Sequence, residues 1–235
     1  MKLTLLTLFP ELIAQLRSYG IIGRAIRNGL IDLSIVQIRD YTASKHGKVD
    51  DAPYGGGAGM IMGCQPIADA IDAAAAPASH VVYLSPQGAV LTQEKARELT
   101  EKEDLVLLCG HYEGIDERLL HTHIDEEISI GDYILTGGEL PAMVLVDVMA
   151  RFLEDTVGSR ENVESDSLSD GLLKHPQYTR PQNWRGLQVP EILLSGDHKR
   201  IDAYRQEESL RVTRAKRPDL YEAYQKKSDE ENNRG

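Results

Sequence analysis

Cysteine is scarce in this chain of 235 residues, which contains only Cys64 and Cys109. Two cysteines cannot form a disulfide framework or a four-cysteine metal site, so we expect a protein of the reducing cytoplasm. Long apolar runs are also missing, since none approaches the roughly 18 residues that a membrane-spanning helix needs. The apolar start, residues 3–9, is followed by Pro10 and Glu11 without a small-residue cleavage site. It is therefore predicted to be a buried strand and not a signal peptide.

Positive charge is also in deficit. Lys and Arg together number 26 and Asp and Glu 37, for a net charge of −11, which taken alone argues against a nucleic-acid partner. Most of the excess negative charge falls within residues 1–150, and the C-terminal part is nearly balanced. That part contains a basic stretch made of Lys199, Arg200, Arg205, Arg211, Arg214, Lys216 and Arg217. A solvated helix with ion pairs to Asp202, Glu207 and Glu208 explains this stretch as well as a phosphate-binding surface does.

The rest of the composition is typical of a folded protein. A hydrophobic share of 41% and a charged share of 27% exclude wholesale disorder, collagen and a coiled coil. Short aliphatic and β-branched runs predict strands at residues 3–9, 31–38, 80–85 and 104–109. Amphipathic stretches predict helices at residues 10–18, 21–29, 65–75, 92–102, 114–121 and 139–153, with Thr92 as an N-cap. Strands alternate with helices, and the run 104–109 is apolar on both faces. We therefore expect a layered α/β fold with parallel strands.

The pattern changes after Phe152. Residues 154–171 are polar and aperiodic, which indicates a linker, and a helical pattern returns from about residue 190, interrupted by Pro218. Within the linker, Asp170 is predicted to cap a following helix, whereas Asp166 is either a second cap or a general base on a loop. Arg151 closes the preceding helix, where it either interacts with the helix dipole or neutralises charge on a substrate.

Glycine is concentrated in three loops, at residues 54–60, 109–118 and 130–141. Two of them follow strand-like runs, where α/β sheets bind ligands, and glycine lets backbone N–H groups approach a ligand closely. Neither a Walker loop nor a dinucleotide fingerprint is present. The loops therefore indicate either tight turns or a small ligand held by backbone groups. His121 and His123 lack further ligands at metal-binding spacing, so an exposed helix end is favoured over a zinc site.

Seven motifs follow one another along residues 1–218. They are Leu8–Glu11, Asp50–Met60, Leu84–Gly88, Cys109–Arg118, Ser129–Pro141, Asp166–Leu173 and Pro176–Pro181. In this combination the chain resembles the bacterial tRNA (guanine-N1)-methyltransferases that modify position 37, a family of SPOUT-type enzymes. It departs from the family at His111, where many members carry arginine, and at Lys174-His175, where others carry Asp-Cys.

The resemblance implies a knotted α/β fold. It implies a methyltransferase domain over residues 1–157, with a mostly parallel sheet and a deep trefoil knot. A linker over residues 158–171 and a small helical tRNA-binding domain over residues 172–235 are implied to follow. It further implies S-adenosylmethionine (SAM) as methyl donor, a tRNA with G37 as substrate and a cytoplasmic homodimer with shared active sites and no membrane contact. Mg²⁺ is a candidate second cofactor, with no certain ligands.

The resemblance also implies roles for individual residues. Asp166 falls on the family's general base, Arg151 on its catalytic arginine, and Glu113 on a carboxylate linked to Mg²⁺. Residues implied to bind SAM are Tyr83, Leu84, Ser85, Pro86, Gly110, Tyr112, Glu113, Ser129, Ile130, Gly131, Tyr133, Leu135, Gly137, Gly138 and Pro141. Residues implied to bind tRNA are Gly55, Gly56, Gly57, Gly59, Arg214, Lys216 and Arg217.

Two other functions stay open at this point. One is a knotted methyltransferase that modifies a ribose 2′-OH, and the other is a non-catalytic RNA-binding or nucleotide-sensing module. A carboxylate at position 166 favours chemistry at N1, because the proton there has to be removed before a methyl group is accepted. A nicotinamide enzyme is least favoured, since the dinucleotide fingerprint is missing.

Overall fold

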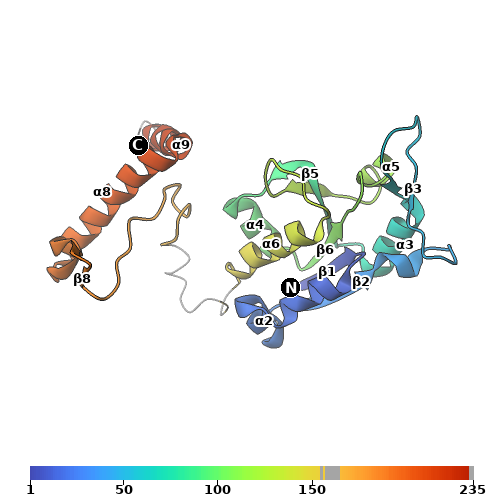
Figure 1. Cartoon of the computed structure of the whole chain (residues 1–235), viewed down its shortest axis with the longest axis horizontal. Helices are drawn as coiled ribbons and strands as arrows, with labels where there is room; N and C mark the ends of the chain where they lie inside the picture. Colours follow the sequence, from blue (N-terminus) through green and yellow to red (C-terminus); the bar gives the residue numbers. More distant parts are fainter. Residues whose placement is uncertain (154–155, 157–164, 233–235) are drawn as a thin grey trace. The chain divides into compact units, whose positions relative to one another are not determined.

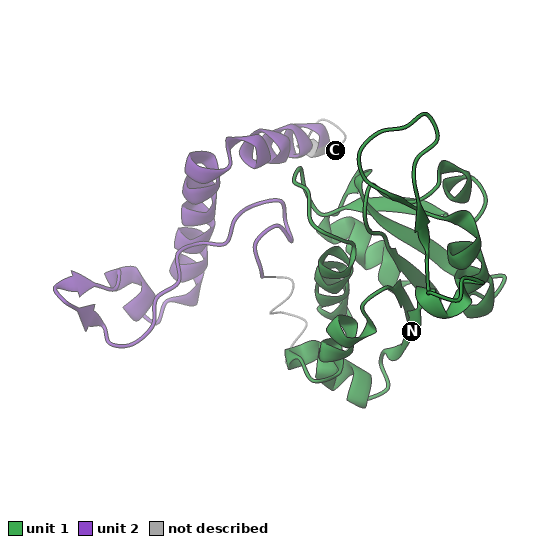
Figure 2. Cartoon of the chain, turned by 45° about the vertical axis from the view of Figure 1, so that its right-hand side comes forward, with its two compact units in different colours: residues 1–158 green, residues 159–235 purple. Residues whose placement is uncertain are grey.

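A computed structural model describes residues 1–153, 156 and 165–232 (Figure 1). The chain divides into two compact units, residues 1–158 and 159–235 (Figure 2). The expected linker at residues 158–171 therefore lies partly outside the described residues. Among those that are described, no helix is both long and apolar enough to cross a membrane.

The first unit is built on a parallel sheet. Its strands are β1 (Lys2–Thr7), β2 (Asp32–Gln37), β5 (His80–Val90), β6 (Asp104–Cys109) and β7 (Glu126–Ser129). They lie in the order β2-β1-β6-β5-β7, and every neighbouring pair is parallel. This confirms the expected α/β class with a mostly parallel sheet.

Helices connect the successive strands, as parallel pairing requires, and a further helix follows β7. They are α1 (Pro10–Ile13), α2 (Gly20–Arg27), α3 (Cys64–Ala74), α4 (Gln93–Thr100), α5 (Glu117–Leu120) and α6 (Glu139–Ala150). Three 3₁₀ turns, η1 (Ala14–Arg17), η2 (Ile38–Tyr41) and η3 (Glu191–Leu194), also occur in the described chain. A short antiparallel pair, β3 (Asp50–Asp51) and β4 (Ile61–Met62), flanks the first glycine loop.

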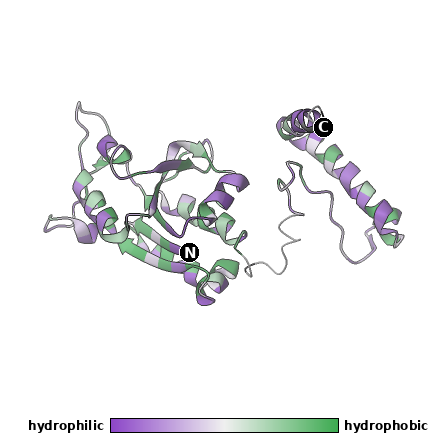
Figure 3. Ribbon diagram, turned by 180° about the vertical axis from the view of Figure 1, so that it is seen from behind, coloured by the Kyte–Doolittle hydropathy of each residue, from purple (hydrophilic) through white to green (hydrophobic). Residues whose placement is uncertain are grey.

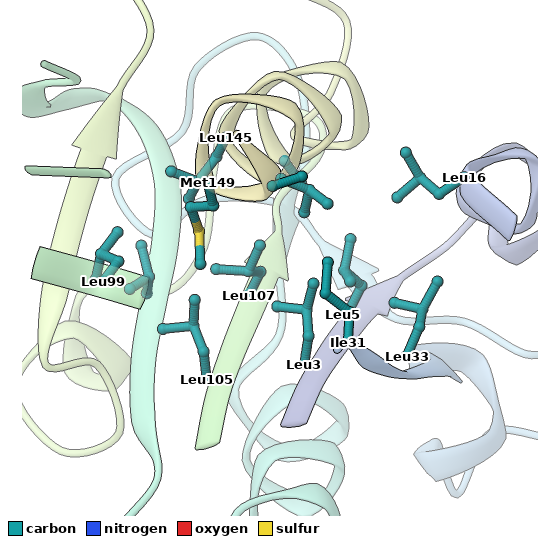
Figure 4. Packing of buried hydrophobic residues seen from close by; sticks show 14 of the residues in the cluster. Leu3, Leu5, Leu16, Ile31, Leu33, Leu99, Leu105, Leu107, Leu145 and Met149 are labelled. Atoms are coloured by element: carbon teal, nitrogen blue, oxygen red, sulfur yellow. The ribbon is translucent and has the colours of Figure 1, made fainter. Parts of the chain in front are cut away.

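Side chains alternate along the central strands and form two cores. Leu3 and Leu5 of β1, with Leu105 and Leu107 of β6, pack with residues of α4 and α6 on one face (Figure 4). Leu6 of β1, with Val106 and Leu108 of β6, packs with residues of α3 and α5 on the other face. A strand buried on both faces reads as a continuous apolar run, which is why β1 and β6 were predictable. In Figure 3, hydrophobic colouring is accordingly concentrated on the central strands.

The predicted elements agree with the structure apart from their ends. Strand β7 and the short elements β3, β4, η2, β8 (Asn183–Trp184) and β9 (Leu187–Gln188) were not predicted. The predicted helix 10–18 divides into α1 and η1, and the predicted helix 114–121 shortens to α5, because Gly114 has φ +116° and Asp116 is the N-cap. Thr92 caps α4 as expected, accepting a hydrogen bond from the Lys95 N–H at 3.1 Å. Strand β7 was missed because it is short and begins with two glutamates, which do not form an apolar run.

Strand β5 is interrupted where it passes β7. Leu84 and Ala89 both pair with Ile128, so residues 85–88 bulge out of the ladder. Gly88 lies so close to the backbone of Glu127 and Ile128 that a Cβ atom there would overlap both. The bulge therefore adds a loop at the carboxyl end of the sheet.

The second unit is mainly helical. It contains α8 (His198–Lys216) and α9 (Pro218–Asn232), so Pro218 divides the two helices as predicted, and a hairpin of β8 (Asn183–Trp184) and β9 (Leu187–Gln188). The prediction that Asp170 caps a following helix was wrong. Asp170 Oδ1 accepts a hydrogen bond from the Leu172 N–H at 3.0 Å within a turn, and in the described chain the next helical element is the 3₁₀ turn η3.

Candidate functional site

A cavity of about 250 Å³ lies at the carboxyl ends of β5, β6 and β7. Three segments line it: the bulge after Leu84, the loop 110–115 and the loop 129–138. The end of the strands in a parallel sheet is where ligands of α/β proteins bind. All fifteen positions that the resemblance assigned to SAM line this one cavity, although they come from three separate parts of the sequence.

Two of the cavity walls touch through their backbones. The Gly138 N–H donates to the Gly110 carbonyl at 2.8 Å. A Cβ atom on Gly138 would lie 2.7 Å from the Cα of Cys109 and 2.8 Å from the nitrogen of Gly110. Real Cβ contacts are longer, so position 138 requires glycine. The approach brings backbone groups of both loops to the cavity, in line with the expectation that they hold a small ligand.

Tyr83 forms the inner wall of the cavity. Its ring leaves no room for a side chain at Gly110, since a Cβ atom there would lie 2.7 Å from the Tyr83 Cε2. Burial, and then the negative charge of Glu127, raise the pKa of Tyr83 to about 12. The phenol is therefore neutral at physiological pH, and Tyr83 acts here as a packing and hydrogen-bonding group.

The charges around the cavity are acidic. Glu113, Glu117 and Glu127 line it, and the lining includes neither lysine nor arginine. Within the described chain, Glu127 Oε2 is buried without a hydrogen-bond partner. Such surroundings favour a ligand that carries positive charge. Glu117 and Glu127 were not identified from the sequence, because an acidic residue in a mixed stretch gives no signal of its own.

The first glycine loop adjoins the cavity through Glu113. Gly55, Gly56, Gly57 and Gly59 all have positive φ angles, between +79° and +132°. A Cβ atom on Gly59 would lie 2.5 Å from the Cγ of Glu113, and the Glu113 N–H donates to the Met60 carbonyl at 2.9 Å. Of the residues predicted to contact tRNA, the structure therefore brings Gly59 against Glu113 at the cavity.

The two residues predicted to act on the substrate belong to different units. Arg151 is the C-cap of α6 in the first unit and is not one of the lining residues. Asp166 belongs to the second unit, where its Oδ1 lies 3.3 Å from the Lys174 Nζ. Lys174 also donates its backbone N–H to Ser167 at 2.9 Å, so it holds the segment around Asp166.

The basic stretch consists partly of ion pairs. Arg205 pairs with Asp202, and Arg211 with Glu208, at 3.2 and 2.7 Å. These are two of the acidic partners expected for a solvated helix. Arg217 pairs with Asp219 at 2.6 Å. Arg214, Lys216 and Arg217 fall together at the C-terminal end of α8.

The described residues contain no set of metal ligands. No three His, Cys, Asp or Glu side chains in the described ranges are grouped so that they could hold an ion. His121 is the exposed C-cap of α5 and lies 3.6 Å from Glu117, in agreement with the helix-end interpretation.

Comparison with known proteins gives consistent matches. The family model described as tRNA (Guanine-1)-methyltransferase TrmD matches residues 1–223. A tRNA (guanine-N(1)-)-methyltransferase of Finegoldia magna is 51% identical over 98% of this chain and 99% of its own length. Proteins of the same name from Ruminiclostridium cellulolyticum and Clostridioides difficile are 54% and 48% identical, over 94% and 98% of this chain and 96% and 100% of their own lengths.

The contact at Gly138 predicts a local loss of stability. We expect Gly138→Ala to lower the free energy of unfolding by about 1–3 kcal/mol, because the new methyl group overlaps backbone atoms that cannot move aside. Denaturant titration at equal protein concentrations measures the change. Gly63→Ala is the control, since the nearest atom to its Cβ would be the Val49 carbonyl oxygen at 3.7 Å, an ordinary van der Waals distance. Equal stability of the two variants would contradict the prediction.

Proposed function

The chain belongs to the tRNA (guanine-1)-methyltransferase family, and from this membership we propose that it transfers a methyl group from SAM to N1 of guanine 37 in tRNA. The observation that carries the proposal is the gathering of all fifteen expected donor positions around one cavity. In the proposed reaction Asp166 is the general base and Arg151 stabilises charge on the guanine O6.

The cavity suits SAM by its charge and by its walls. A cavity lined by Glu113, Glu117 and Glu127, without lysine or arginine, favours a sulfonium over an anionic ligand. Backbone groups of the loops 110–115 and 129–138 are available to a neutral adenosine moiety. When bound, SAM supplies an already activated methyl group, so the chain needs no nucleophilic side chain.

The acceptor requires two protein groups. Neutral guanine carries a proton on N1, so a base within hydrogen-bond distance has to remove it, and Asp166 is a carboxylate of the right kind. Negative charge develops on O6 as the proton leaves, and the guanidinium of Arg151 has the sign to stabilise it. The guanine has to leave its stack to be reached. The described residues offer no group of three His, Cys, Asp or Glu side chains that could hold Mg²⁺.

A second copy of the chain is expected to cover α6. Apart from Glu139 and Asp147 this helix is apolar: Ala142, Leu145 and Met149 are buried, while Leu140 and Val144 remain 50% and 42% exposed. A helix apolar on every face is normally buried on every face. Phe9 and Leu12, next to α6 through α1, are exposed as well. This apolar surface supports a homodimer with shared active sites.

The proposal also includes the knot. Support comes from the backbone contact of Gly138 with Gly110, and from the passage of Gly88 against β7. Both bring loops from distant parts of the sequence through one small region. The second unit is proposed to bind tRNA, with the chain acting in the cytoplasm.

The methylated product and the role of Asp166 as general base can be tested together. With labelled SAM, we expect methyl transfer to an unmodified tRNA transcript with G37, recovered as 1-methylguanosine, and none to the A37 transcript. Asp166→Ala should lower the single-turnover rate by about 10²–10⁴, the usual contribution of a general base. Asp170→Ala, four residues away, is the matched control and should keep a near-normal rate. Label on a ribose, or on both transcripts, would instead indicate the 2′-OH enzyme, and donor binding without transfer a binding module.

The second prediction concerns phosphate contacts. Replacing Arg214, Lys216 and Arg217 by alanine should weaken tRNA binding and reduce its salt dependence, because fewer counterions are released. SAM affinity should not change. A Lys226→Ala, Lys227→Ala double variant tests whether any loss of positive charge has the same effect. Unchanged tRNA affinity in the triple variant would refute the assignment.

The third prediction concerns the dimer. Val144→Glu should convert the protein to monomers in sedimentation velocity and abolish methyl transfer, because a charge is placed in an apolar contact. Val90→Glu, the same change at a residue that is 56% exposed elsewhere in the first unit, should stay dimeric. A wild-type protein that is monomeric at micromolar concentration would contradict the proposal.

A further inference from the structure

A buried carboxylate lies beside the cavity walls. Glu139, in the first turn of α6, is only 3% exposed. Its Oε1 accepts a hydrogen bond from the Thr7 hydroxyl at 2.7 Å, and its Oε2 lies 2.6 Å from the His111 Nε2. Burying a carboxylate is costly unless both oxygens have partners, and here both do. Because an ionised carboxylate only accepts, Nε2 is the donor in this contact.

The two partners of Glu139 lie at or just beyond the ends of different strands, β1 and β6. Thr7 ends β1 and also accepts a hydrogen bond from the Phe9 N–H at 2.9 Å. His111 follows β6, and its ring centroid lies 4.9 Å from that of Phe9. The carboxylate thus connects the ends of β1 and β6 with the start of α6, and the imidazole is held between Glu139 and Phe9.

His111 lies where the two glycine-rich walls of the cavity meet. It forms an isolated antiparallel bridge with Gly137, where a Cβ atom would overlap the imidazole. Its N–H donates to the Met62 sulfur at 3.3 Å, and its carbonyl accepts from the Gly114 N–H at 3.1 Å. The position of the imidazole therefore sets how closely the loop 110–114 approaches residues 137–138.

We propose that Glu139 is a positioning residue for the methyl donor, acting through its contact with His111. By fixing the imidazole over Gly137, it keeps the backbone of the two cavity walls at the spacing that the donor requires. Thr7, in contrast, completes the hydrogen bonding of the buried carboxylate and of the Phe9 N–H. The inference rests on the proposed function, because it takes SAM as the occupant of the cavity.

The test measures SAM affinity calorimetrically on the full chain without RNA. Glu139→Gln should weaken SAM binding by about tenfold, the usual value of one hydrogen bond to a charged group. In methyl-transfer assays the KM for SAM should rise by a similar factor, while kcat at saturating SAM and the KM for tRNA change less than threefold.

A second pair of variants tests the same contact from the other side. Glutamine can place an amide N–H where His111 carries Nε2, whereas leucine cannot. We expect His111→Leu to lose SAM affinity as Glu139→Gln does, and His111→Gln to bind SAM at least fivefold more tightly than His111→Leu. This pair keeps the test valid if Glu139→Gln does not fold.

Thr7→Val separates positioning from stability. It removes the other hydrogen bond of Glu139 and should lower the thermal midpoint, yet keep SAM affinity within twofold of the wild type. Equal losses of affinity in Thr7→Val and His111→Leu would overturn the inference, since the network would then act only through stability. So would unchanged affinity in His111→Leu. A wild-type protein that binds no SAM would overturn the proposed function as well, so the two failures can be told apart.

Discussion

Direct contact between two stretches of backbone, at Gly138 and Gly110, constrains the whole carboxyl end of the sheet. The distances leave no space for a Cβ atom at position 138, so helix α6 starts immediately beside the end of strand β6. The loops on either side of the contact, residues 110–115 and 129–138, line the cavity. A parallel sheet brings strand ends together in any case, but it is the missing side chain that lets the loops carry backbone groups to a ligand.

Acidic side chains around that cavity contribute to the net negative charge of the protein. A net charge of −11 is unexpected for an enzyme that acts on tRNA, which is itself negatively charged. Two groups of charged residues lie in different parts of the chain. Carboxylates line the cavity proposed for a cationic donor, and basic residues lie on α8 of the second unit. Two of those basic residues are neutralised by acidic neighbours on the same helix. The surface proposed to bind phosphate is therefore smaller than the composition of the stretch suggests.

The sequence predicted those strands whose apolar pattern has a single cause, the burial of both strand faces. Residues of β1 and β6 are apolar on both faces because both faces are buried, and that pattern is local. Strand β7 was missed, because Glu126 and Glu127 are held in the sheet by pairing with β5, a partner more than 40 residues away. The cavity residues of the glycine loops could be assigned from the family resemblance, whereas Glu127 and Glu139 could not, since their roles depend on neighbours from other strands. Asp170 looked like a helix cap because its side chain does accept a backbone N–H, but in a turn.

The strand order has a consequence for how the chain is made. Strand β1 pairs with β2 on one side and with β6 on the other. Its pairing with β6, which places Lys2 opposite Asp104, cannot form until about 100 further residues have been synthesised. Strand β5 likewise gains both of its neighbours from residues synthesised after it. A chain emerging from the ribosome at about 5–20 residues per second therefore leaves one edge of β1 without its strand partner for several seconds. Contacts of such long sequence separation also form slowly. Until β6 has emerged, the nascent protein thus carries an unpaired strand edge of the kind that pairs with other chains.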